Sequence, residues 1–302
     1  MKILTIITAL GITFNVSACL LEWELEAERE LARTGKRDVA SHFTSDPLTA
    51  RQVATDIPIG TGDRFAGGFV TPVGLGVEER DLESVLNVDE VQSALQGLRR
   101  RFPDQVTLFQ PPFETYEGRK LYGAVVGDNP RVFIMSGIHA RERGGPDNVI
   151  YFLADLLAAS KAGTGVSYGG KSYTADQVKV ALSVGIVIIP LTNPDGVTHD
   201  QKNNDCWRKN RNPTSASGAS NGADVGIDLN RNYDFAWNVT ETFHPNIVKS
   251  GIPPASTDPR SQLFHGTAPA SEPETEAVVW TFDQYTNLTW FVGTLFLVSL
   301  VM

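Results

Sequence analysis

The sequence predicts an α/β domain with a mostly parallel mixed sheet and helices on its flanks. Between residues 87 and 292, short apolar runs alternate with segments of helical periodicity, and this alternation is typical of α/β folds with a largely parallel sheet. The 302 residues can bury a full-sized core, and 20% of them are charged, as in ordinary globular proteins. The net charge of −9 argues against a nucleic-acid partner, because no excess of cations is present to neutralise phosphates.

The first residues have the pattern of a secretory signal. Lys2 precedes an apolar run from Ile3 to Val16, and small residues follow up to Ala18. This run is too short to span a bilayer, and we expect no transmembrane segment elsewhere. We therefore expect residues 1–18 to be a signal peptide and the protein to be secreted. A buried N-terminal strand and, because of Cys19, a bacterial lipid anchor are the alternatives.

Sequons and cysteines add to this interpretation. The sequons Asn238-Val239-Thr240 and Asn287-Leu288-Thr289 are compatible with a secreted eukaryotic protein. Apart from Cys19, the only cysteine is Cys206. We therefore expect no internal disulfide framework, and Cys206 to be a packed side chain.

Residues 19–86 read as a pro-segment and linker. They carry a dibasic step at Lys36 and Arg37, and residues 46–79 are rich in Gly, Thr and Pro with little periodicity. Such a composition buries little apolar surface by itself. Regular structure is therefore expected from about Asn87.

The elements of the domain follow in order. Val88, Val91, Leu95 and Leu98 recur at helical spacing, and Pro103 ends that helix. The segments expected after it are strands at Lys120–Gly127 and Arg131–Gly137, a helix opened by Pro146, a helix near Ala175–Leu182, a strand at Val184–Pro190, and a helix at Val278–Tyr285 that Ser271 and Glu274 precede at the spacing of a capping box.

His139 and Glu142 follow directly on the strand that ends at Gly137. In such sheets, ligands bind just outside the carboxyl ends of strands. A spacing of three lets an imidazole and a carboxylate converge on one ion, and catalytic zinc sites use mixed nitrogen and oxygen ligands. The pair therefore indicates half of a zinc site, although an H-x-x-E pattern also arises by chance.

Three later segments support a site. Asn193–Gly196 follows the second buried strand, but its sequence also suits a simple turn. Trp207–Arg211 clusters cations in an acidic protein, and Asp228–Asn232 adds an arginine flanked by amides. Such runs are usually solvated faces, but arginine also suits the capture of a carboxylate or an oxyanion. A cationic pocket beside a metal half-site would fit a substrate with a free carboxylate.

Five segments in this order resemble the carboxypeptidase A family of zinc metallocarboxypeptidases, over about residues 87–291. They are YEGR from Tyr116, HARE from His139, NPDG from Asn193, WRK from Trp207 and DLNRN from Asp228. The resemblance implies a carboxypeptidase-like fold, one Zn²⁺ ion and the removal of C-terminal residues from peptides or proteins. It also implies that His139 and Glu142 are zinc ligands, that Arg208 stabilises the oxyanion as a catalytic residue, and that the substrate is bound by Arg141, Asn230 and Arg231.

The resemblance stops near the end of the chain. In the family, the strand resembling Leu288–Val292 leads to a third zinc ligand, a His followed by Ser, whereas residues 293–302 form an apolar tail here. The family's general-base Glu, its substrate-binding Tyr and its specificity pocket would also come later. We therefore expect residues 87–292 to be a partial domain that lacks its last third, with residues 293–302 as an aberrant tail from an intron or frameshift. This chain is then expected to hydrolyse little, and a non-catalytic protein that binds peptide carboxylates or a non-functional fragment are the alternatives.

Overall fold

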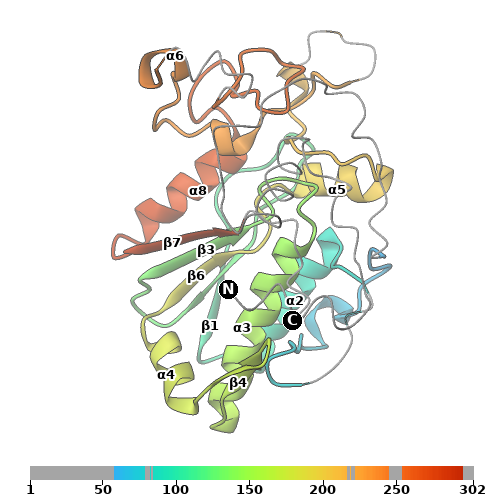
Figure 1. Ribbon diagram of the computed structural model, residues 1–302. Helices are drawn as coiled ribbons and strands as arrows, with labels where there is room; N and C mark the ends of the chain where they lie inside the picture. Colours follow the sequence, from blue (N-terminus) through green and yellow to red (C-terminus); the bar gives the residue numbers. More distant parts are fainter. Residues whose placement is uncertain are drawn as a thin grey trace.

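A computed structural model gives the structure of residues 58–78, 82, 84–215, 218, 222–244 and 254–294. The expected signal peptide, Cys19 and the dibasic step lie outside these residues. One five-stranded sheet stands at the centre, with α2 (Val88–Arg101) and α3 (Gly144–Ala162) on one face and α8 (Pro273–Gln284) on the other (Figure 1). The described residues contain no helix that is both long and apolar enough to cross a membrane.

The central sheet is mixed, as predicted. Its order is β1 (Val106–Phe109), β2 (Gly123–Val126), β6 (Ile186–Ile189), β3 (Val132–Ser136) and β7 (Trp290–Thr294). Strand β3 pairs in parallel with β6 and β7, whereas β2 pairs antiparallel with β1 and β6. The parallel pairings therefore lie around β3, which leads into the HARE segment.

Shorter elements surround this sheet. The remaining α-helices in the described parts of the chain are α4 (Ala175–Ser183), α5 (Pro194–Asn203) and α6 (Val239–Thr242). A small antiparallel hairpin is formed by β4 (Val166–Tyr168) and β5 (Lys171–Tyr173), and the 3-10 turns are η2 (Ala66–Gly68), η3 (Pro213–Ser215) and η4 (Leu229–Arg231).

Both faces of the sheet are buried, and this explains the continuous apolar runs of the central strands. On β3, Phe133 and Met135 join the core beneath α8, while Ile134 packs against the core beneath α2 and α3. Strand β6 divides in the same way, because successive side chains of a strand point to opposite faces. Strands covered on both faces need apolar residues at every position.

Helix α2 begins at a complete capping box. The Asn87 side chain accepts a hydrogen bond from the Glu90 backbone N–H (2.9 Å), and the Glu90 carboxylate accepts one from the Asn87 N–H (3.0 Å). The predicted helix at this position is therefore confirmed. The Asn87 side-chain amide also donates to the carbonyl oxygens of Gly60 and Gly62, at 3.0 and 2.8 Å, and so ties the preceding segment to the helix.

Residues 58–78 pack on the domain through specific contacts. Phe65 is buried in the core with Leu86, and the backbone N–H of Gly76 donates to the buried carboxylate of Asp155 at 2.8 Å. Tyr168 donates its hydroxyl hydrogen to the same carboxylate oxygen, also at 2.8 Å. This part of the chain therefore contributes to the core, more than its composition indicates.

Two local predictions are wrong. The capping box at Ser271 and Glu274 does not form: the N-cap of α8 is Glu272, Ser271 donates to the Glu272 carboxylate (2.8 Å), and Glu274 is wholly buried. Asn210 holds both carboxylates instead, at 2.7 and 3.1 Å, so tertiary contacts replace the local cap. Cys206 is disulfide-bonded, not simply packed, and its partner lies outside the described residues.

Candidate active site

The predicted site residues lie at the carboxyl edge of the sheet. Strands β3 and β6 run in parallel side by side, so the HARE and NPDG segments that follow them start at the same edge. Gly137, between β3 and His139, has a φ of +61°, and a Cβ there would lie 2.9 Å from Leu191 Cδ1. Only glycine combines this backbone conformation with such close packing.

Asn193 joins the segments that meet at this edge. It caps α5, with its side-chain oxygen accepting from the Gly196 N–H at 2.9 Å. Its side-chain nitrogen donates to the carbonyl oxygens of Ile138 and Lys209, both at 3.1 Å. The NPDG sequence, which also suited a simple turn, therefore opens a helix and links the HARE segment to the WRK segment.

His139 and Glu142 converge as their spacing predicts. Both are buried, and His139 Nδ1 lies 2.7 Å from Glu142 Oε1. A neutral imidazole nitrogen without a hydrogen and a carboxylate oxygen are both acceptors, so this approach needs a proton or a cation between them. Glu142 Oε2 is buried and has no hydrogen-bond partner among the described residues. One imidazole nitrogen and a carboxylate with an unused buried oxygen are a donor set that fits a cation such as zinc.

The other nitrogen of His139 contacts Asp228. The distance from Nε2 to Asp228 Oδ1 is 3.2 Å, across 89 residues of sequence. Arg208 donates to the second oxygen of the same carboxylate, from Nε and from Nη2, both at 3.0 Å. Burial alone would raise the pKa of Asp228, but the charges of Arg208 and His139 outweigh burial and hold that pKa well below its usual value. One ionised carboxylate therefore joins the imidazole to the guanidinium.

The predicted substrate-binding residues flank this network. Asn230 and Arg231 belong to η4 and are half-buried, and the backbone N–H of Asn230 donates to Asp228 Oδ1 at 3.0 Å. Arg231 Nη1 donates to the Asn230 carbonyl oxygen at 3.0 Å. Arg141 is buried, next to Glu142 in sequence. Asp228 thus fixes the start of the segment that carries Asn230 and Arg231.

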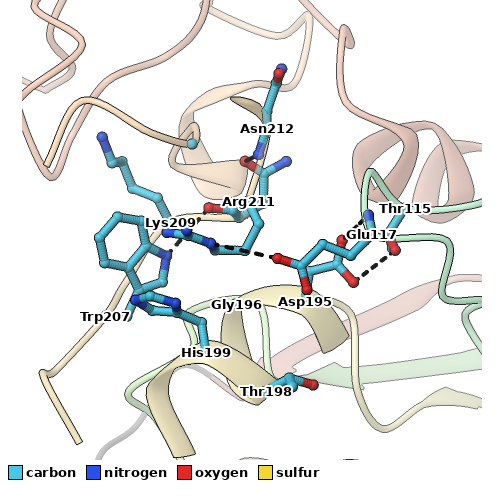
Figure 2. A network of polar contacts seen from close by, with 12 residues as sticks. Thr115, Glu117, Asp195, Gly196, Thr198, His199, Trp207, Lys209, Arg211 and Asn212 are labelled. Carbon is cyan, nitrogen blue, oxygen red and sulfur yellow. Dashed lines mark hydrogen bonds and ion pairs between the residues drawn. The ribbon is translucent and has the colours of Figure 1, made fainter. Parts of the chain in front are cut away.

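The YEGR segment forms a turn that is fixed by α5 (Figure 2). Asp195 accepts hydrogen bonds from the Thr115 hydroxyl (2.8 Å) and from the Glu117 N–H (2.9 Å), and pairs with Arg119 at 2.8 Å. Glu117 also lies 3.8 Å from Arg211 Nε. These contacts give the YEGR and NPDG sequences a supporting role beside the WRK segment.

Other histidines contribute little to the site. His199 contacts Asp205 (3.2 Å) and packs edge-on against the Trp207 ring, and the His265 ring packs against Trp237. His244 is exposed, and His42 lies outside the described residues. Among the residues that the structure describes, no three His, Cys, Asp or Glu side chains form a group that could hold a metal ion.

A comparison with known protein families shows to which family this chain belongs. The zinc carboxypeptidase family matches residues 91–295. The chain belongs to this family. Its similarity to individual members is moderate: it is 29% identical to carboxypeptidase A2 of Rattus norvegicus over 66% of this chain and 41% of that protein. With carboxypeptidase B of Astacus astacus, it shares 28% identity over 64% of this chain and 55% of that protein.

Two solved structures have a similar fold. Carboxypeptidase A from Helicoverpa armigera superposes with a TM-score of 0.53 at 23% identity, over 70% of this chain and 45% of that one. Bovine thrombin-activatable fibrinolysis inhibitor, solved with a tick carboxypeptidase inhibitor, gives a TM-score of 0.52 at 24% identity, over 70% and 60%. The chain spans less than half the length of its mammalian carboxypeptidase A relatives.

Asp228 is the site residue that the sequence analysis left without a role. It opens the DLNRN segment, but nothing local indicates that its carboxylate contacts both His139 and Arg208. The available signal was an acidic residue just before Asn230 and Arg231, the residues expected to bind the substrate carboxylate. Metal-ligating histidines usually donate their other N–H to a carboxylate, and Asp228 could have been considered for this role.

Proposed function

We propose that this protein is a zinc-dependent metallocarboxypeptidase that removes C-terminal residues from peptides or proteins. The observation that carries the proposal is the contact of one buried carboxylate, Asp228, with both His139 and Arg208. This contact supports the proposal because it joins the pair that would bind the metal to the cation that would bind the oxyanion, and metal-assisted peptide hydrolysis uses both groups.

In this proposal His139 and Glu142 hold the zinc ion, which supplies a Lewis acid when bound. The support is that both side chains are buried with Nδ1 and Oε1 2.7 Å apart, and that the buried Glu142 Oε2 has no hydrogen-bond partner in the part of the chain that the structure describes. Arg208 polarises the scissile carbonyl and stabilises the oxyanion that develops on it. The bonds from Arg208 to Asp228 orient the guanidinium and use only part of its five N–H donors.

Asn230 and Arg231 bind the terminal carboxylate of the substrate, and Arg141 holds the peptide on the other side of the scissile bond. A planar guanidinium forms paired hydrogen bonds with a carboxylate, and this geometry suits recognition of a free C-terminus. The short link through Asp228 supports these roles, because it sets the distance between the carboxylate-binding segment and His139.

The test uses the full chain, purified and loaded with zinc. The proposal predicts that zinc binds in a 1:1 ratio and that a peptide loses its last residue, at a low rate in line with the little hydrolysis expected from the sequence. Arg231→Ala should lower kcat/KM at least about tenfold, because it removes a charge-assisted pair with the substrate. Arg131→Ala is the matched control, since Arg131 is exposed at the start of β3, away from the site. A zinc-loaded chain without turnover, or equal activity of the two variants, would refute the proposal.

Binding of peptide C-termini without hydrolysis is the second candidate function. It is favoured by the described residues, which offer His139 and Glu142 but no group of three metal-binding side chains. The same samples distinguish it: a peptide that binds the chain, loses affinity on Arg231→Ala and is never cleaved would indicate a binding protein.

Secretion is the localisation that we propose, with residues 1–18 as the signal peptide and residues 19–86 as a pro-segment. The exposure of Asn238 and Asn287 supports it, since both sequons are accessible for glycosylation. In a eukaryotic secretory host, the medium should contain a glycoprotein whose mass falls after treatment with an N-glycosidase. Retention of unmodified protein inside the cell would contradict this.

A further inference from the structure

Arg143 forms a buried ion pair immediately after the Glu142 ligand candidate. Its Nε donates to Asp200 Oδ2 at 2.6 Å, and its Nη2 donates to the backbone oxygen of Asp200 at 3.2 Å. Asp200 lies in α5 and is fully buried, and Arg143 is only 6% exposed. Two donors of one planar guanidinium are therefore fixed on a single residue, which sets the orientation of the arginine.

The second oxygen of Asp200 reaches a different segment. Asp200 Oδ1 accepts a hydrogen bond from the backbone N–H of Trp207 at 2.8 Å. Trp207 directly precedes Arg208, the proposed oxyanion-binding residue. One side chain in α5 therefore holds the residue after Glu142 with one oxygen and the residue before Arg208 with the other.

A parallel contact supports the same arrangement. The backbone N–H of Ala140 donates to the carbonyl oxygen of Arg208 at 3.2 Å, so the HARE and WRK segments also touch directly. Asn193 and Asp228 also bridge the two segments, at Ile138 and Lys209 and at His139 and Arg208. The buried Arg143–Asp200–Trp207 link adds a further restraint between them, and breaking it leaves a charge without its partner in the interior.

We propose that Arg143 and Asp200 are positioning residues that fix the metal-binding Glu142 relative to Arg208. The role rests on the proposed carboxypeptidase function, since it matters only if metal and guanidinium act on one substrate carbonyl. Neither residue touches the substrate in this arrangement. Arg143 acts on Glu142 through the peptide bond between these two neighbours. Asp200 acts on Arg208 through Trp207, whose N–H it holds and which directly precedes Arg208.

Asp200→Asn is the decisive variant, because it keeps the size of the side chain and an oxygen for Trp207 but removes the charge that Arg143 needs. We expect zinc affinity, measured by competition with a chelator, to fall about 10- to 100-fold, the usual effect of losing a residue that supports metal ligands. The loss in kcat/KM should come mainly from kcat, with KM little changed. Arg143→Lys, which keeps the charge but loses the planar fork, should show the same effects more weakly.

Glu90→Gln is the matched control. It also breaks a buried carboxylate–arginine pair, Glu90 Oε1 with Arg64 Nε at 2.6 Å, but in α2 and away from the site. We expect Glu90→Gln to lower the free energy of unfolding while leaving zinc affinity and the kcat-to-KM pattern unchanged. Equal losses of zinc affinity in Glu90→Gln and Asp200→Asn would overturn the positioning role.

Hydrogen exchange gives a readout that depends on neither zinc nor activity. In the zinc-free chain, Asp200→Asn or Arg143→Lys should speed amide exchange in both residues 138–145 and residues 205–210, and Glu90→Gln in neither. A change in one segment alone, or in none, would refute the link. If the wild-type chain neither binds zinc nor cleaves peptides, the proposed function fails, and the exchange pattern still decides whether Arg143 and Asp200 join the segments.

Discussion

At the scale of single residues, Asp228 joins His139 to Arg208. Arg208 holds the Asp228 carboxylate ionised, and the other oxygen of that carboxylate lies 3.2 Å from His139 Nε2. On the other side of the ring, His139 Nδ1 lies 2.7 Å from Glu142 Oε1. A residue 89 positions away in sequence therefore helps to fix the orientation of the imidazole that faces Glu142.

Glu274 makes the stability of the protein depend on pH. Its side chain is fully buried in α8, and burial raises its pKa to about 8, although Asn210 donates to it at 3.1 Å. Glu272 and Asp195 face it with like charge and raise the pKa further. Since the folded pKa lies above the unfolded value, the folded state binds the extra proton, and the stability it provides is lost as the pH rises toward 8.

We therefore expect Glu274→Gln to be more stable than the wild type at pH 8 by roughly 1–4 kcal/mol, and about equally stable at pH 4, below the unfolded pKa. The neutral amide imitates the protonated acid and has no charge to bury. Urea unfolding at the two pH values measures the difference. Glu276→Gln, an exposed site on the same helix, is the control; an identical pH dependence in both variants would contradict the role of Glu274.

At the scale of elements, the N-cap residue of α2 both begins the helix and binds a distant segment of the chain. Asn87 satisfies the Glu90 N–H and also donates to the carbonyl oxygens of Gly60 and Gly62. Thr174 forms a comparable capping box at α4, with Gln177, but no further hydrogen bond of its side chain is found among the described residues. A comparison of the two caps therefore separates the stability that comes from capping a helix from the stability that comes from the contacts with Gly60 and Gly62.

Asn87→Ala should destabilise the protein by about 2 kcal/mol or more, because a lost cap costs about 0.5–2 kcal/mol and the bonds to residues 60 and 62 are lost as well. Thr174→Ala should cost about 1 kcal/mol or less. Urea midpoints of the two variants measure the difference. Equal losses would mean that the contacts with Gly60 and Gly62 contribute nothing to stability.

Elements with a strong internal pattern could be predicted, and those defined by tertiary contacts could not. Helix α2 and the strands β3 and β6 have clear apolar patterns. Helix α5 is polar after its first turn, so its sequence resembles a turn until Asn193 and Pro194 are seen as its start. Strand β1 has four residues and only its neighbour β2 defines it.

The same difference between local pattern and tertiary contact applies to the candidate site. The convergence of His139 and Glu142 follows from a spacing of three, which a single turn of chain can satisfy. The contacts of Asp228 with His139 and of Asp200 with Arg143 span 89 and 57 residues. No local pattern records such pairs, because they depend on how parallel strands bring distant loops to one edge of the sheet.

At the scale of the whole molecule, the sheet has an apolar edge. Within the described residues, β7 pairs only with β3, so its other edge offers backbone groups without a strand partner. Trp290 and Val292 on β7 are 71% and 43% exposed, and the strand carries no charge or proline. Natural sheets usually protect such an edge with charged residues, because an uncharged edge pairs with other chains.

We therefore expect the 302-residue chain to self-associate as its concentration rises. The double variant Trp290→Lys/Val292→Lys should raise the concentration at which light scattering first detects oligomers, because two lysines would meet on each paired edge. Phe235→Lys is the matched control: it also replaces an exposed apolar side chain by lysine, at 93% exposure, but in a loop away from the sheet. If Phe235→Lys suppresses association as strongly, then general surface hydrophobicity and net charge govern association, and the β7 edge has no special part in it.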